Sequence, residues 1–143
     1  MLRPRPVEQS CVVPYRTIGI RIEFALITSR NTGRWIVPKG TVEPNMTPAA
    51  SAAKEALEEA GLLGETGTEP LGEYFYSKFG RVYRVEIYPL LVTRELDDWD
   101  EKRFRKREWV GAADALFRIT ETLVQDAIRL LAETDGHIAS PPR

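Results

Sequence analysis

Residues 40–62, which read GTVEPNMTPAASAAKEALEEAGL, contain the features that decide the fold. Thr47 is a suitable N-cap, Pro48 suits the first helical position, and Gly61 suits the position just after the last turn. Alanines at positions 49, 53, 56 and 60 share one narrow face of such a helix. The stretch therefore predicts a helix that lies close to a β-sheet, because side chains this small allow close approach.

Three carboxylates of this predicted helix are Glu55, Glu58 and Glu59, at the spacing i, i+3, i+4. They fall within an arc of roughly 100°, at the edge of the alanine face. Like charges this close repel each other unless a cation lies among them, and oxygen ligands suit a hard ion such as Mg²⁺. The pattern indicates a metal-assisted enzyme.

The bulk properties of the chain indicate a small globular protein. It has 143 residues, 43% of them hydrophobic and 29% charged, which suits one α+β domain spanning residues 1–143 and not a disordered or membrane-embedded class. A net charge of −1 gives no general attraction to nucleic acid. The absence of a signal-like or membrane-spanning apolar run predicts a cytoplasmic protein without a membrane partner. Its oligomeric state, monomer or homodimer, is open.

Strands are expected on both sides of the central helix. The pattern predicts strands over 11–15 and 19–28, joined by a turn near residues 16–17, and strands over 71–77 and 82–93 around a turn at 78–80. Pro89 favours an edge position or a bulge. A strand over 104–110, a helical turn over 114–117 and a helix from 120 or 121 to 134 follow. Residues 1–8 and 136–143 are expected to be loose, with His137 solvated, and Cys11 is either a small apolar strand residue or, as the alternative, a reactive thiol.

The stretch from residue 40 to residue 62 resembles the Nudix box in register. The positions that fit are Gly40, Glu55, Ala56, Glu58, Glu59, Gly61 and Leu62. This resemblance implies a Nudix α/β/α sandwich with a mixed central sheet, and hydrolysis of a nucleoside diphosphate linked to another group. Residues 91–93, 98–99 and 106–109 resemble the branch that hydrolyses diphosphoinositol polyphosphates and diadenosine polyphosphates.

The resemblance also implies roles for the box residues. Glu55 and Glu59 would be metal ligands, Glu58 would be a ligand or the general base, and the carbonyl of Lys39 would add a ligand; Glu58 and Glu55 are the catalytic candidates. The ion would be Mg²⁺, with Mn²⁺ as a substitute. Such an ion neutralises a diphosphate and lowers the pKa of a bound water, whose proton a nearby carboxylate can take.

Two box positions depart from the pattern. Met46 replaces a glutamate and Lys54 replaces an arginine. A thioether is a poor Mg²⁺ ligand, and lysine lacks the planar fork of arginine. One interpretation is that these positions only brace the loop, so that catalysis persists. The other is weakened metal binding or lost catalysis, which would leave a nucleotide-binding or regulatory module.

Substrate phosphates require cations or backbone donors. The predicted substrate-binding residues are Arg30, Lys39, Gly40, Arg81, Arg84 and Arg105. The alternative for the arginines is a solvated basic face. Val7 and Gln9 stand where the resembled branch carries basic residues, which favours dinucleoside polyphosphates or other nucleoside diphosphate derivatives over inositol polyphosphates.

Other polar and aromatic residues have competing interpretations. The acidic stretch 95–101 either is solvated or supplies a further metal ligand. Trp35 either packs or stacks on a base. Trp109 and the tyrosines at 74, 76 and 83 are interpreted as packing residues.

Overall fold

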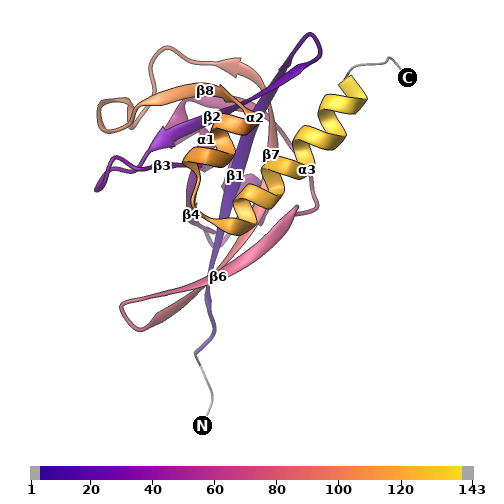
Figure 1. Ribbon diagram of the computed structural model, residues 1–143. Helices are drawn as coiled ribbons and strands as arrows, with labels where there is room; N and C mark the ends of the chain where they lie inside the picture. Colours follow the sequence, from indigo (N-terminus) through magenta and orange to yellow (C-terminus); the bar gives the residue numbers. More distant parts are fainter. Residues whose placement is uncertain (1–3, 140–143) are drawn as a thin grey trace.

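The computed structural model describes residues 4–139 of the chain, with side chains described through residue 134. In this part of the chain the strands form one mixed sheet in which β1 (Val7–Ile18) is central (Figure 1). β1 is antiparallel to β2 (Arg21–Thr28) and parallel to β7 (Arg81–Glu95). The remaining strands are β3 (Trp35–Ile36), β4 (Lys39–Thr41), β5 (Leu62–Thr66), β6 (Gly72–Lys78) and β8 (Arg107–Gly111).

Helices cover both faces of the sheet. α1 (Pro48–Ala60) packs on one face, and α2 (Ala112–Arg118) and α3 (Thr122–Ala139) lie on the other (Figure 1). Alternate residues of β1 face opposite sides, so Val12 packs in the α1 core whereas Cys11 and Val13 pack in the α3 core. The predicted α/β/α sandwich with a mixed sheet is confirmed.

The predicted limits of α1 are also confirmed. The hydroxyl of Thr47 accepts a hydrogen bond of 3.1 Å from the Ala50 N–H, and Gly61 ends the helix in the left-handed region at φ 66°. The buried face differs from the predicted alanine face, because its alanines are Ala52, Ala56 and Ala60. Glu59 lies within this buried face and not merely at its edge.

The first hairpin turn was placed wrongly by the sequence pattern. β1 continues through the expected turn to Ile18, which pairs with Arg21 across a two-residue turn that contains Gly19. Gly19 has φ 63°, which suits a tight hairpin turn, and Arg16 stays in the strand through a 2.8 Å ion pair with Glu23.

Pro89 is not on an edge strand, because β7 has neighbours on both sides. It pairs in register with Val13 of β1. On the other side of β7, β6 pairs as far as Ile87 and β5 begins at Leu90. Pro89 therefore lies where the antiparallel partner changes, and a missing N–H is tolerated there.

Several other boundaries differ from expectation. β1 begins at Val7, inside the expected loose segment, and the 104–110 strand begins only at Arg107, after a 3₁₀ turn at Lys102–Phe104. α3 continues to Ala139, so residues 136–139 are helical. The side chain of His137 and residues 1–3 and 140–143 lie outside the described part. No helix in that part is long and apolar enough to span a membrane.

Candidate active site

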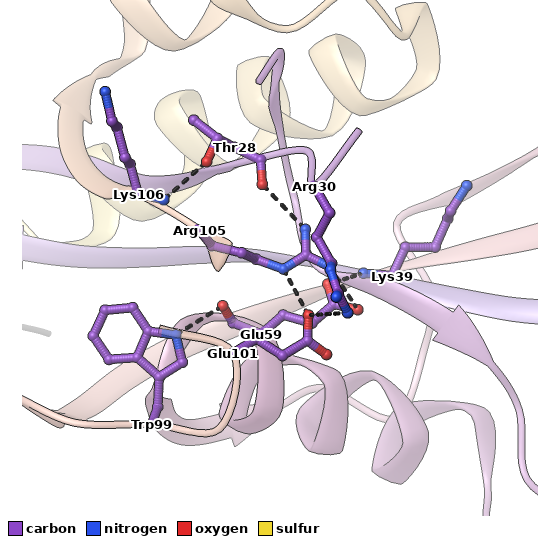
Figure 2. A network of polar contacts seen from close by, with 8 residues as sticks. All are labelled: Thr28, Arg30, Lys39, Glu59, Trp99, Glu101, Arg105 and Lys106. Atoms are coloured by element: carbon purple, nitrogen blue, oxygen red, sulfur yellow. Dashed lines mark hydrogen bonds and ion pairs between the residues drawn. The ribbon is translucent and has the colours of Figure 1, made fainter. Parts of the chain in front are cut away.

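Glu59 is a buried carboxylate on the sheet side of α1, only 7% exposed. Its Oε1 accepts a 3.2 Å hydrogen bond from the backbone N–H of Lys39, and its Oε2 lies 3.7 Å from Nη2 of Arg105 (Figure 2). Burial raises the pKa of Glu59, whereas Arg105 and the Lys39 N–H act in the opposite direction. Contacts from two separate parts of the chain thus fix the orientation of this carboxylate.

Glu55 lies beside Glu59, close enough for each carboxyl group to affect the pKa of the other. Burial raises the pKa of Glu55 as well, and the nearby charge of Glu58 acts in the same direction. The Glu55 carboxyl lies against Gly40, where an added Cβ would overlap it. Two adjacent carboxyl groups beside a side-chain-free position fit the oxygen donor set of a divalent cation.

Glu58, the third carboxylate of the box, has its own ion pair. Its Oε2 lies 2.7 Å from Nζ of Lys54, which also lies 3.3 Å from Oε2 of Glu43. Among the described residues no three carboxylate, thiol or imidazole side chains converge as a metal-binding group. Of the three predicted carboxylate ligands, the structure brings Glu55 and Glu59 together, and the metal-binding roles of all three stay predictions.

The C-terminal end of α1 is held by the loop that joins β7 to β8. The Trp99 indole N–H donates to the Glu59 carbonyl at 3.0 Å, and the Glu101 N–H donates to the Glu58 carbonyl at 3.0 Å. Trp99 packs against Gly61, where a Cβ would overlap the indole ring. These donors satisfy carbonyls that the last helical turn leaves free.

The same loop corrects the prediction of a wholly solvated acidic stretch. Asp97, Asp98 and Asp100 are exposed as expected. Glu101 instead accepts a 2.9 Å hydrogen bond from Nε of Arg105 and lies 4.0 Å from Nη1 of Arg30 (Figure 2).

Arg105 is buried, with a side chain 9% exposed. Besides its contacts with Glu101 and Glu59, its Nη1 donates to the Thr28 carbonyl at 3.1 Å (Figure 2). The guanidinium therefore has protein acceptors on three sides. The sequence assigned Arg105 to substrate phosphates, whereas the structure places it primarily as a support for Glu59.

Two adjoining cavities open beside this network. The Glu59 cavity has a volume of about 530 Å³ and is lined by residues that include Arg30, Lys39, Glu59 and Arg105. The tyrosine cavity has a volume of about 440 Å³, and its lining includes Arg34, Trp35, Tyr74, Tyr76 and Glu121. Lys39, Lys78, Ser29 and Ile36 line both cavities.

Lys39 occupies the boundary between the two cavities. Its Nζ donates to the Tyr76 hydroxyl at 3.2 Å, and that hydroxyl donates to Oε1 of Gln9 at 2.7 Å. Tyr76 also stacks on Tyr83, with ring centroids 4.7 Å apart, which confirms packing on the strands for these two tyrosines. The packing of Tyr76 holds the ammonium group of Lys39 in place.

The predicted cations separate into two groups. Arg30 and Lys39 line the cavities, whereas Arg81 and Arg84 line neither of them. Arg84 lies among three carboxylates, with its nearest nitrogen atoms 2.9 Å from Glu73, 3.3 Å from Glu8 and 3.4 Å from Glu86. Neither cavity therefore supports the placement of Arg81 and Arg84 at the substrate, which stays a prediction.

Sequence reasoning missed several cavity residues. Tyr74, Tyr76 and Lys78 alternate along β6 and therefore share one face, so strand periodicity alone was the signal that would have grouped them. Lys78 was assigned to the turn and not to the site. No local signal marked Glu121, because it reaches the tyrosine cavity from a segment far from the other lining residues in sequence.

The chain is similar to known proteins over most of its length. The family model described as the NUDIX domain matches residues 18–133. The chain belongs to the Nudix family. It is 41% identical over 91 residues to diphosphoinositol polyphosphate phosphohydrolase 3-beta of Bos taurus, an alignment that covers 62% of this chain and 54% of that protein. The chain thus spans about half the length of the curated relatives it matches.

Solved structures show the same Nudix fold. A C. elegans Ap4A hydrolase in a binary complex superposes with a TM-score of 0.74 at 22% identity, covering 92% of this chain and 99% of that one. The NUDIX domain of Shewanella oneidensis NrtR, complexed with ADP ribose, gives a TM-score of 0.69 at 13% identity, with 90% of each chain covered. At these identities the likeness concerns the fold alone.

Proposed function

We propose that this Nudix protein is a Mg²⁺-dependent pyrophosphohydrolase that cleaves a diphosphate linkage in dinucleoside polyphosphates or other nucleoside diphosphate derivatives. Mn²⁺ would substitute for Mg²⁺, and the location would be the cytoplasm. The observation that supports the proposal is that Glu55 and Glu59 lie side by side on α1, with Glu55 against Gly40 and Glu59 at a cavity lined by cations.

Glu55 and Glu59 would hold the cation, with the carbonyl of Lys39 as a further donor. When bound, the cation would neutralise phosphate charge and lower the pKa of a water molecule. The chain itself keeps Glu59 oriented through the Lys39 N–H and Arg105. Glu58 or Glu55 would take the proton from water; Glu58, with its side chain 35% exposed, is within reach of solvent.

The cavities indicate how a polyphosphate substrate would lie. Arg30, Lys39 and Lys78 would bind phosphate oxygens, since charged donors form the stronger hydrogen bonds. The tyrosine cavity offers aromatic rings for stacking on a nucleobase, as in other nucleotide sites. Glu121 would accept a hydrogen bond from a base amino group, and it would repel a ring densely substituted with phosphates.

Purified protein assayed with Mg²⁺ or Mn²⁺ against a panel of phosphoanhydrides tests this proposal. The panel contains diadenosine tetraphosphate, ADP-ribose and a diphosphoinositol polyphosphate, and chromatography identifies the products. We expect turnover of a nucleoside-containing substrate, with products that locate the cleaved anhydride bond. Turnover of the inositol compound alone would contradict the proposed substrate class.

A second candidate function is a nucleotide-binding or regulatory module without catalysis. The observation that favours it is the 2.7 Å ion pair between Lys54 and Glu58, with which a cation at Glu58 would have to compete. Calorimetric titration with the same nucleotides distinguishes the two functions. Tight binding without turnover at any Mg²⁺ or Mn²⁺ concentration would support the module.

A further inference from the structure

The segment that leads into α1 forms a tight turn between Glu43 and Met46. The Met46 N–H donates to the Glu43 carbonyl at 3.0 Å, and Pro44 occupies the position after Glu43, which suits a β-turn. The Cα atoms at the two ends of such a turn lie within about 7 Å of each other. A carboxylate at either end can therefore approach the same part of α1.

Glu43 makes that approach and contacts Lys54. Nζ of Lys54 lies 3.3 Å from Oε2 of Glu43 and 2.7 Å from Oε2 of Glu58, so one ammonium group lies between two carboxylates. An ammonium group has three donors on a flexible stem, and it can bind two acceptors without the fixed geometry of a guanidinium. The Nudix box has a glutamate at position 46 and an arginine at position 54, and this chain has neither.

We propose that Glu43 is a positioning residue that supplies the carboxylate missing at Met46, and that it acts by sharing Lys54 with Glu58. When Glu58 turns toward a divalent cation, Lys54 keeps Glu43 as its partner. Without Glu43, the same movement would leave Lys54 without a carboxylate, so a cation would have to compete with a stronger Lys54–Glu58 pair. This inference rests on the proposed cation site at Glu55 and Glu59.

Direct Mn²⁺ titration of four proteins, read by electron paramagnetic resonance of the free ion, tests the inference. The proteins are the wild type, Glu43→Gln, Lys54→Met and the double variant, with Glu65→Gln as a control for the loss of one exposed carboxylate. We expect Glu43→Gln to weaken Mn²⁺ binding about threefold in the wild-type background, the scale of a partly exposed ion pair. In the Lys54→Met background the same substitution should have no effect, and Glu65→Gln should bind Mn²⁺ as the wild type does.

This double-mutant cycle distinguishes a positioning role of Glu43 from a direct electrostatic attraction between Glu43 and the cation. If Glu43→Gln weakens Mn²⁺ binding equally in both backgrounds, Glu43 does not act through Lys54 and the inference is overturned. Wild-type affinity in Glu43→Gln also overturns it. A wild type that binds no Mn²⁺ would contradict the proposed cation site itself, which is a different result from a bound ion that is insensitive to Glu43.

Discussion

Arg105 and Glu59 form a buried ion pair, with Nη2 and Oε2 3.7 Å apart and the two side chains 9% and 10% exposed. The pair joins the β7–β8 loop to the C-terminal part of the Nudix box. Burying a carboxylate is costly without a compensating charge and hydrogen bonds. Arg105 therefore stabilises the ionised form of the carboxylate that is proposed to hold the cation.

The first prediction concerns this pair. Arg105→Met should lower kcat at least tenfold while KM changes less than twofold, because Glu59 loses the group that orients it. Removing one partner of a buried pair costs roughly 3 kcal/mol, so the melting temperature should fall as well. Steady-state kinetics and thermal melts measure both effects, with Arg103→Met, an exposed arginine of the same loop, as the control. A raised KM with unchanged kcat would restore Arg105 to the role of a phosphate ligand.

The second prediction concerns the glycine that faces Glu55. Gly40→Ala should reduce turnover at least tenfold, because the new Cβ displaces the Glu55 carboxyl from its position beside Glu59. The carboxyl is the end of a flexible side chain, so the fold should persist with little change in melting temperature. Gly72→Ala is the matched control, because a Cβ there meets nothing within 4 Å. Equal activity in the two variants would show that Glu55 tolerates displacement.

The third prediction separates cations that line the cavities from those that do not. Lys78→Ala and Arg34→Ala should each raise KM for a polyphosphate substrate about tenfold, the scale of one charged hydrogen bond. Arg81→Ala should leave KM unchanged, although Arg81 is the cross-strand partner of Lys78 in the same hairpin. Saturation kinetics at fixed Mg²⁺ measures the three values. A larger effect at Arg81 than at Lys78 would reverse the assignment.

The fourth prediction concerns Cys11, which is fully buried beneath the tyrosine cavity. Burial raises the pKa of its thiol from 9.0 to about 12, so at pH 9 it stays protonated in the folded protein, whereas an unfolded thiol is half ionised. Because the thiolate is the nucleophile, iodoacetamide at pH 9 should label the folded protein far more slowly than the urea-unfolded protein. Equal labelling rates would support the alternative of a reactive thiol.

Local signals were sufficient to predict α1 from the sequence. The N-cap Thr47, Pro48 and the left-handed Gly61 mark the two ends of the helix. The spacing of the box glutamates showed that they share one side of it. These features depend on neighbours in sequence, which a single sequence displays. The α/β/α architecture was instead predicted from the resemblance to the Nudix family.

Features that depend on distant contacts were not predictable in the same way. From the sequence, Arg105 is interpreted as a cation free to bind substrate, whereas in the fold Glu59 and the Thr28 carbonyl lie beside its guanidinium. Glu101 reads as a solvated acid for the same reason, and Pro89 reads as an edge residue until the change of strand partner in the sheet is known. In each case tertiary structure supplied a partner that sequence spacing does not show.

The most direct test of the proposed cation site is the turnover of diadenosine tetraphosphate with Mg²⁺ by the wild type and by Glu59→Gln. The amide keeps the size of the side chain but removes the carboxylate that the cation requires, so we expect a loss of about a hundredfold or more. Glu69→Gln, which changes an exposed carboxylate outside the box, should retain full activity. An active wild type together with a Glu59→Gln variant that works at the same rate would contradict the assignment of this carboxylate to the cation.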